Sequence, residues 1–386
     1  MFEVRRLGYD ADLDYLTSAD YNDGLANETP SWSYDAAGNR NDASVVDNLN
    51  RATTIGGVAR TYDILGNTLT IGSSKSMTWD ALNRMTSLTS GATTTNYAYR
   101  PDGMRVSKDY GTDSSRFYYD GQMPMETLDT TSSGSTVTRN GLGARGIDRI
   151  ERVNSSGTTV GYPLYDGHGN MVATLAKSGT SFSLGDQRAY DAWGVIRQGA
   201  TSGDPKGRYC ASLGHVDDDE SGLTYMRARY YEATVGRFMS ADTSKDGLNW
   251  FVYCLNNPIG KIDYSGNSAL DLSDAIIKII WQNMQPLVFN LTVAGLVFGA
   301  GACLAAAEQD YWAAGALAAA SILSLASAAL LARMGYGLFA HGLKENADRI
   351  QVCGGLFLLG NAGLNLLGVA LGISTGDEDD AWVFGF

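Results

Sequence analysis

A short motif recurs through the first half of the chain: an aromatic residue, aspartate, two variable residues, then glycine and asparagine. Near-complete copies lie at 34–39, 62–67 and 165–170, and partial copies at 79–84, 99–103, 119–121 and 190–194. Aspartate caps such a turn by accepting a hydrogen bond from the backbone two residues on. Glycine or asparagine supplies the left-handed residue that reverses the chain. The motif therefore predicts turns at Asp35–Asn39, Asp63–Asn67 and Asp166–Asn170.

Alternating apolar and polar residues follow these turns, as in NTLTIG (67–72), NRMTSL (83–88), MRVSK (104–108) and NMVATL (170–175). This period of two is typical of a half-buried strand. The 46 glycines and 21 tyrosines, against 7 prolines, also suit many short strands joined by tight turns. A sandwich or propeller with coincidental turns would explain one copy of the motif but not a series. A D-x-[DN]-x-[DN]-G calcium loop is absent from the sequence, which favours turn capping over calcium binding.

An ordered set of motifs fills residues 208–267: an opening GRY, ESGLTYMRARYY (220–231), GRFMSAD (236–242), GLN (247–249), an aromatic run ending in NNP, and DYSG (263–266). The alternation in MRARYY predicts one strand with Arg227 and Arg229 on the same face. The acidic run Asp217–Glu220 suggests a solvated loop, and lone His168 is placed in a repeat turn.

Over about residues 30–267, these motifs resemble the YD repeats and repeat-associated core of RHS proteins, Tc-toxin C components and teneurins. The resemblance implies a spiral of β-hairpins wound into a shell. We expect only part of a shell wall, because too few repeats remain to enclose a cavity. The expected domains are YD/RHS repeats (1–207), the repeat-associated core (208–267) and a hydrophobic C-terminal domain (268–386). The expected fold is mainly β, a YD-repeat β-hairpin spiral followed by an α-helical tail.

In bacterial RHS and Tc-C proteins the core is an aspartyl autoprotease that frees a C-terminal toxin. The resemblance places Asp242 and Asp263 at the two DPxG positions, with the cut near Asn267–Ser268. Two close carboxylates that share a proton can act as base and acid. Arg237 lies near in sequence and is the candidate for holding one carboxylate ionised.

The core departs from the family pattern in both DPxG motifs. Asp242 is followed by Thr-Ser-Lys, without proline or glycine. Asp263 is followed by Tyr264 in place of proline, and Asn267 stands where the family has leucine. The alternative to self-cleavage is that both aspartates cap turns in a plug that closes the shell.

Three stretches without a charged residue follow Asn267, at 279–307, 311–332 and 351–376. Each reaches the roughly 20 residues that a helix needs to span a bilayer, and small residues at close spacing suit helix packing in lipid. We expect a membrane-inserting domain with membrane lipid as its partner over 279–376. A soluble, alanine- and glycine-rich helical bundle is the alternative.

The formal net charge of −13 makes nucleic acid an unexpected partner, because phosphate binding rests on Lys and Arg. The four cysteines have no CxxC spacing, so we expect buried thiols, no metal and no cofactor. The sequence contains no HExxH, GxSxG or P-loop motif. The first residues lack the apolar run of a signal peptide.

These features favour the C-terminal part of an RHS-type toxin or delivery shell, from a membrane-associated or secreted bacterial protein. An immunity protein or a delivery apparatus is the expected protein partner. The alternative is a non-enzymatic surface or adhesion module whose tail is a membrane anchor. A third interpretation is carbohydrate binding by tyrosine and tryptophan faces of the shell.

Overall fold

The computed structural model describes residues 4–21, 28–41, 44–143, 146–245, 247–267 and 269–271, together with Thr292. Contacts divide the chain into residues 1–272 and residues 273–386, and the fold described below is that of the first unit. The expected helical tail and its membrane spans over 279–376 lie outside the described residues, Thr292 excepted. Within the described ranges, no helix has the length and hydropathy needed to cross a membrane.

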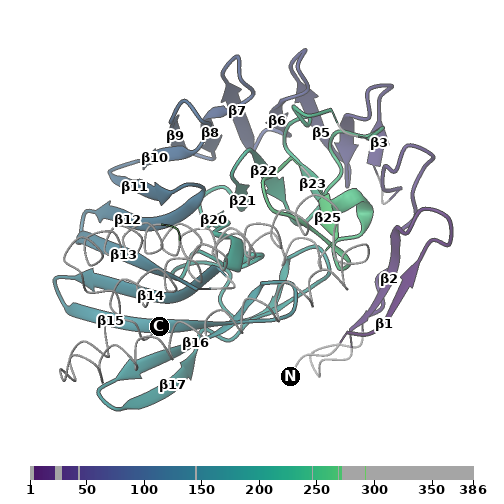
Figure 1. Ribbon diagram of the computed structural model, residues 1–386. Helices are drawn as coiled ribbons and strands as arrows, with labels where there is room; N and C mark the ends of the chain where they lie inside the picture. The colour runs from purple at the N-terminus through teal and green to yellow at the C-terminus, as the bar shows by residue number, and fades with distance from the viewer. Residues whose placement is uncertain are drawn as a thin grey trace, which may run out of the picture. The chain divides into compact units, whose positions relative to one another are not determined.

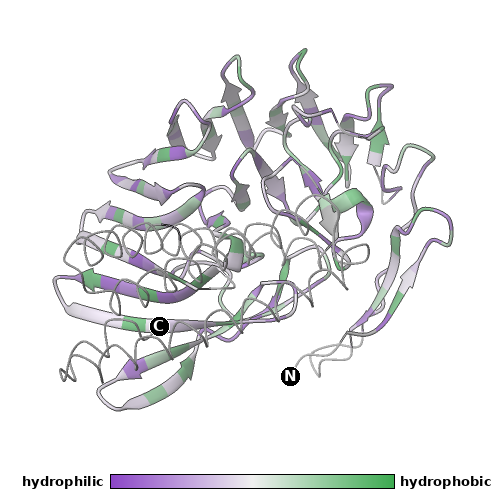
Figure 2. Ribbon diagram, viewed as in Figure 1, coloured by the Kyte–Doolittle hydropathy of each residue, from purple (hydrophilic) through white to green (hydrophobic). Residues whose placement is uncertain are grey.

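Fifteen antiparallel strands form one open sheet in which every strand pairs with its neighbour in sequence. Figure 1 shows this sheet as an arc, which confirms a mainly β fold. The strands are β3 (Ser44–Val46), β4 (Ala52–Ile55), β5 (Val58–Tyr62), β6 (Thr68–Ile71), β7 (Lys75–Trp79), β8 (Met85–Ser90), β9 (Thr93–Tyr99), β10 (Arg105–Tyr110), β11 (Asp113–Asp120), β12 (Met123–Thr131), β13 (Gly134–Gly143), β14 (Gly146–Asn154), β15 (Gly157–Tyr165), β16 (Met171–Ser178) and β17 (Ser181–Gly185). Hydrophobic and hydrophilic residues are interspersed along them (Figure 2), as the period of two predicts.

The core segment carries a smaller, four-stranded sheet inside the arc (Figure 1). Its strands are β20 (Val216–Asp218), β21 (Leu223–Met226), β22 (Arg229–Glu232) and β23 (Arg237–Phe238). The other elements are β1 (Val4–Tyr9), β2 (Leu16–Tyr21), β18 (Ala189–Tyr190), β19 (Ile196–Gln198), β24 (Lys261–Asp263), β25 (Ala269–Asp271) and the 3₁₀ helices η1 (Ala211–Leu213) and η2 (Cys254–Asn256). Met77, Leu88 and Tyr97 of the arc share one buried cluster with Leu223 and Tyr230 of the core. Burial of these side chains is what holds the core against the concave face of the arc.

The predicted YD turns are confirmed, and the turn at Asp63 shows how one is built. Asp63 Oδ1 accepts hydrogen bonds from the backbone N–H groups of Leu65 (2.9 Å) and Asn67 (2.8 Å), and Oδ2 accepts one from the Asn67 side chain. Gly66 has a φ of +86°, and a Cβ at that position would lie 3.0 Å from the Cβ of Ala241 in the core. The turn thus needs glycine both for its left-handed backbone and for its contact with the core.

One further turn of this kind, Asp47–Arg51, escaped the sequence motif because Val46 stands in place of the aromatic residue. Asp47 Oδ1 accepts from the N–H groups of Leu49 (2.9 Å) and Arg51 (3.0 Å), as in the other turns. The last residue of one turn also reaches the next turn along the edge of the sheet. These links are Asn39 to Asn50, Arg51 to Asp63, Asn67 to Asn83, and Arg84 to Arg100.

Removing one capping carboxylate is expected to destabilise the fold measurably. The change Asp63→Ala removes three hydrogen bonds to a charged acceptor, so we expect unfolding to become about 1–3 kcal/mol easier. Urea unfolding of the variant and of Asp120→Ala measures the difference. Asp120 is an exposed aspartate at the end of β11 and should change stability by less than about 0.5 kcal/mol. Equal effects of the two changes would argue against a stabilising cap.

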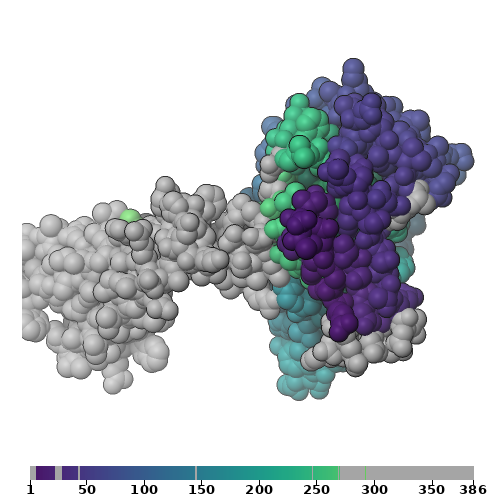
Figure 3. Space-filling model, turned by 90° about the vertical axis from the view of Figure 1, so that its right-hand side faces the viewer, coloured from purple at the N-terminus to yellow at the C-terminus, as the bar shows by residue number. Residues whose placement is uncertain are grey.

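Two asparagines of the core tie it to the N-terminal part of the chain. Asn256 donates from its side chain to the carbonyl oxygen of Gly38 (2.8 Å), and Asn257 donates to the Asp14 carboxylate (2.8 Å). Figure 3 shows the surface of the N-terminal strands, in dark purple, beside the green surface of the core. Repeats and core therefore form one packed unit.

The prediction of one continuous strand through MRARYY is wrong. Residues 223–226 and 229–232 are instead the two strands of a hairpin, with Met226 opposite Arg229. Arg227 lies in the turn with a φ of +61°. Arg227 therefore belongs to the two-residue turn, and Arg229 is the first residue of the second strand. Both side chains are buried.

Candidate functional site

Asp242 and Asp263, the two candidate catalytic residues, meet at one buried guanidinium group. Asp242 lies four residues after β23 and Asp263 ends β24, while Arg229 begins β22. Arg229 Nη2 lies 3.4 Å from Asp242 Oδ2 and 3.5 Å from Asp263 Oδ2. All three side chains are buried. The structure therefore brings the two aspartates together, with an arginine as the group they share.

Each aspartate also caps a turn. Asp242 Oδ1 accepts a hydrogen bond from the N–H of Ser244 (2.7 Å). Asp263 Oδ1 accepts from the N–H groups of Ser265 (3.2 Å) and Gly266 (2.7 Å). The contacts are those expected of turn caps in a plug.

Arg229 has three further contacts within the core. Its Nε donates to the carbonyl oxygen of Gly266, and its Nη1 donates to that of Trp250 (3.0 Å). Its guanidinium carbon lies 3.6 Å from the centre of the Phe238 ring. Burial lowers the pKa of Arg229, and the charges of Asp263 and Asp242 oppose that effect.

The hairpin of β21 and β22 holds three consecutive carbonyl groups of residues 264–266. Arg227 Nη1 donates to the Tyr264 oxygen (2.5 Å) and the Ala228 N–H donates to the Ser265 oxygen (3.2 Å). Arg229 holds the third, that of Gly266. Gly266 has a φ of +81°, and a Cβ there would collide with the backbone oxygen of Met226. We call residues 263–267 the exit peptide, because they precede the C-terminal domain in sequence.

Arg237, the arginine expected beside the aspartates, lies elsewhere. It donates to the Asn39 side chain (3.0 Å) and to the carbonyl oxygen of Asn50 (2.6 Å) in the first two YD turns. Burial lowers the pKa of Arg237 to about 10. Sequence reasoning missed Arg229, because MRARYY looked like a single strand and the hairpin that aims Arg229 at Asp263 was not foreseen.

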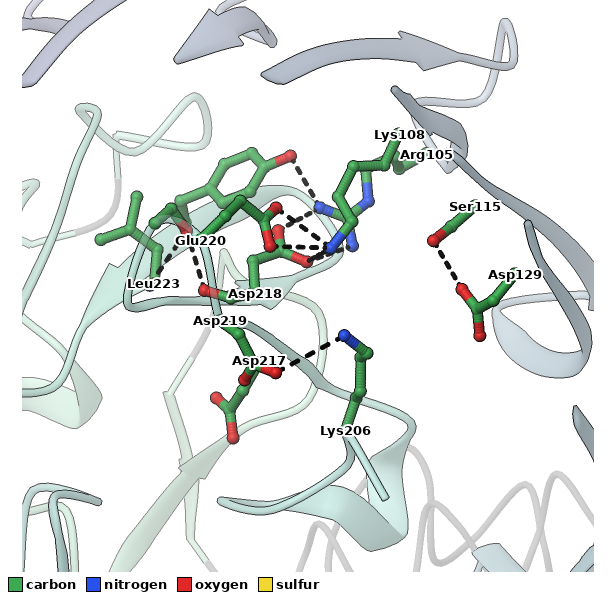
Figure 4. Close-up of polar contacts among 12 residues, drawn as sticks. Arg105, Lys108, Ser115, Asp129, Lys206, Asp217, Asp218, Asp219, Glu220 and Leu223 are labelled. Atoms are coloured by element: carbon green, nitrogen blue, oxygen red, sulfur yellow. Dashed lines mark hydrogen bonds and ion pairs between the residues drawn. The ribbon is translucent and has the colours of Figure 1, made fainter. Parts of the chain in front are cut away.

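A second buried charge cluster joins the core to the arc, and it corrects the expectation of a solvated loop at Asp217–Glu220. Asp218 is fully buried and forms ion pairs with Arg105 and with Lys108 (3.0 Å), both from β10 (Figure 4). Glu220 pairs with Lys108 at 3.0 Å. Although burial alone would raise it, the charges of Arg105 and Lys108 lower the pKa of Asp218 to about 2.

His168 has a sulfur neighbour, although the sequence presented it as isolated. Its Nδ1 lies 3.5 Å from Cys210 Sγ, and its Nε2 lies 3.0 Å from the carbonyl oxygen of Lys261. Burial raises the pKa of the Cys210 thiol far above its usual range. A thiol of that kind is a poor nucleophile, and Cys254 is likewise free and buried. The expectation of small buried thiols is confirmed for these two; Cys303 and Cys353 lie outside the described residues. No group of three or more metal-ligating side chains occurs in the described ranges.

Two histidines and two aspartates have opposite effects on the stability of the fold in acid. Burial lowers the pKa of His215 to about 3 and also lowers that of His168. Burial raises the pKa of Asp217 and of Asp191 to about 6. Between pH 6 and pH 4 the unfolded chain binds more protons at the histidines, and the folded chain binds more at the aspartates. The histidines therefore cost stability as the pH falls, while the aspartates add it.

We expect the free energy of unfolding to change little between pH 6 and pH 4 for this reason. The change His215→Gln removes one opposing group. The variant should therefore gain roughly 2 kcal/mol relative to the unchanged chain as the pH falls from 6 to 4. Urea unfolding at both pH values tests this. A variant with the same pH profile as the unchanged chain would mean that His215 titrates normally in the fold.

No family model matches the chain. It is 28% identical over 277 residues to the tRNA3(Ser)-specific nuclease WapA of Bacillus spizizenii, and 27% identical over 277 residues to the tRNA nuclease WapA of Bacillus subtilis. Each similarity covers 66% of this chain but only 11% of the relative. Because these relatives are named as nucleases of tRNA, they give no support to the expectation that nucleic acid is excluded as a partner.

The fold has a counterpart among solved structures. A chain in the crystal structure of TcdB2-TccC3-Cdc42 superposes with a TM-score of 0.50 at 20% identity. The superposition covers 71% of this chain and 14% of that one. The series of YD turns, the meandering sheet and these similarities agree with the resemblance of the chain to RHS/YD-repeat proteins.

Proposed function

We propose that this chain is the C-terminal part of an RHS-type toxin or delivery shell. Residues 1–207 form part of the shell wall, and residues 208–267 are the repeat-associated core. Residues 268–386 are the variable C-terminal domain. The observation that carries the proposal is the packing of the core against the concave face of the arc through Asp218 and the shared apolar cluster, together with its contact to the turn at Gly38 through Asn256. An immunity protein and a delivery apparatus are the proposed partners.

The core acts in this proposal as a plug that holds the exit peptide and does not cut it. An aspartyl protease needs one of its two carboxyl groups to carry a proton. Asp242 and Asp263 instead share a guanidinium group, which lies within 3.5 Å of both carboxylates. One oxygen of each aspartate is also engaged in a turn cap, as a structural role requires.

Self-cleavage is the second candidate function, and one contact favours it. Arg229 donates from Nε to the carbonyl oxygen of Gly266, one residue before the peptide bond expected to be cut at Asn267–Ser268. That carbonyl belongs to the Gly266–Asn267 bond, next to the bond expected to be cut, so the contact positions the exit peptide beside the two aspartates and does not itself polarise the Asn267 carbonyl. By resemblance to the family, Asp263 would act as the base and Asp242 would be its catalytic partner. Arg229 would take the place that the sequence suggested for Arg237.

For the C-terminal domain we propose insertion into a membrane, on the basis of the three uncharged stretches within 279–376. The named activity of the two relatives supplies the competing proposal, a tRNA nuclease. A third proposal is a surface adhesion module. In that case the same stretches would anchor the protein in a membrane and would not harm a target cell.

Expression of residues 268–386 in bacteria separates these proposals. A membrane-inserting domain is expected to remain in the membrane fraction after carbonate extraction and to collapse the membrane potential of the cells. Expression of residues 1–267 is the matched control and should do neither. Cleaved tRNA with an intact membrane potential would replace the membrane activity with a nuclease. Membrane insertion without loss of potential or growth would favour the anchor.

A further inference from the structure

A cavity of about 860 Å³ lies at the end of the large sheet. It is bounded by β15, β16, the segment from Gln187 to Ala192, and the core residues Tyr209 and Pro258. Its size is that of a pocket for a small organic molecule. Neither the exit peptide nor the Asp242–Arg229–Asp263 cluster contributes to its lining.

The wall of this cavity is mainly apolar. Leu164 and Leu184 line it and remain 42% and 53% exposed. Tyr165 and Tyr190 also line the cavity. Their hydroxyl groups donate to the carbonyl oxygens of Ile147 and Met171 (both 2.8 Å), so the rings are the parts left to contact a ligand. These side chains suit an aliphatic or aromatic body.

One buried cation, Arg188, lies in the same wall. The side chain is 1% exposed, its Nε donates to the carbonyl oxygen of Ala200 (3.0 Å) and its Nη1 to that of Asp186 (3.4 Å). Its Nη2 has no hydrogen-bond partner among the described residues. A buried charged donor without an acceptor is costly, and an anionic group is the partner that would satisfy it best.

Two aspartates in the wall do not serve as that partner. Asp166 accepts from the N–H groups of His168 (2.9 Å) and Asn170 (3.0 Å). Asp191 accepts from those of Trp193 (2.9 Å) and Val195 (2.8 Å). Both carboxylates cap their own YD turns, and the hydrogen bonds of the Arg188 side chain go to the carbonyl oxygens of Ala200 and Asp186 instead.

We propose that the cavity binds a small amphiphilic carboxylate, with its apolar body against Leu164, Leu184 and the tyrosine rings and its carboxylate on Arg188. The site lies apart from the exit peptide and the Asp242–Arg229–Asp263 cluster, although Tyr209 and Pro258 of the core contribute to its lining. Octanoate and octanol are suitable probes because they share an eight-carbon chain and differ in charge.

Isothermal titration of the purified 386-residue chain tests the proposal. Octanoate is expected to bind at least about tenfold more tightly than octanol, since a charge-assisted hydrogen bond to Arg188 adds at least about 1.4 kcal/mol. Arg188→Gln should remove this preference and leave octanol binding unchanged. Leu184→Asp should weaken the binding of both probes by about tenfold or more, because it places a charge in the apolar wall.

Leu82→Asp is the matched control. Leu82 is a 64% exposed leucine in the Asp80–Arg84 turn and does not line the cavity, so this variant should bind both probes normally. Leu184 lies on the edge strand β17, so its variant tests the site even if Arg188→Gln fails to fold. Equal affinity for the two probes, no binding of either, or unchanged binding by Leu184→Asp would overturn the proposal.

Discussion

Replacing Asp218 by alanine is expected to lower the free energy of unfolding by about 3–5 kcal/mol, because it leaves two buried cations without their counterion. Arg105 and Lys108 are almost completely inaccessible to solvent, and both pair with Asp218. Glu220 would still pair with Lys108, but Arg105 would keep only the Tyr230 hydroxyl and aromatic rings as neighbours. The core would therefore lose its strongest electrostatic contact with β10.

The matched control for this change is Asp109→Ala. Asp109 also pairs with an arginine, Arg116, but both side chains are exposed. An exposed pair contributes at most about 1 kcal/mol. Urea unfolding, followed by tyrosine and tryptophan fluorescence, compares the two variants. A loss at Asp218 no larger than that at Asp109 would mean that the buried cluster does not hold the core in place.

The second large effect is expected for Arg229→Met, which leaves Asp242 and Asp263 buried beside each other without a cation. At pH 7 the expected loss is again about 3–5 kcal/mol. Arg229→Lys should recover only part of the stability, since lysine has no Nε donor in the same fork for Gly266.

Arg139→Met is the control for the arginine change, because Arg139 pairs with Glu126 on an exposed face of β12 and β13. It should leave the free energy of unfolding nearly unchanged, because an exposed ion pair contributes little to stability. Hydrogen exchange at residues 263–267 adds a local measurement. Faster exchange there in Arg229→Met, with unchanged exchange in β12 and β13, is the expected pattern. If residues 263–267 exchanged at the same rate in Arg229→Met and in Arg139→Met, Arg229 would not restrain the exit peptide.

The YD turns could be predicted from the sequence because every part of a turn lies within five residues. At Asp63 the cap, the left-handed Gly66 and the closing Asn67 are all visible in the letters. The turn at Asp47 shows the limit of that approach. Its aspartate makes the same contacts, but the aromatic residue that marks the other copies is absent.

The charge clusters could not be predicted, because their partners are far apart in sequence. Asp218 and Arg105 are 113 positions apart, and no local pattern links them. An acidic run such as Asp217–Glu220 looks like a solvated loop until the cations of β10 are known. The pairing of Asp242 with Asp263 came from resemblance to a family, whereas Arg229 depended on a hairpin that the alternation of MRARYY concealed.

The mass of the purified chain after incubation tests the central proposal, a core that holds the exit peptide uncut, most directly. The full chain would be kept for several days at mildly acidic pH, where a carboxylate pair sharing one proton is most populated, and then measured by intact mass spectrometry. The account predicts one species of 386 residues. Pieces of 267 and 119 residues from the unchanged chain, and none from Asp242→Asn or Asp263→Asn, would contradict it and establish self-cleavage instead.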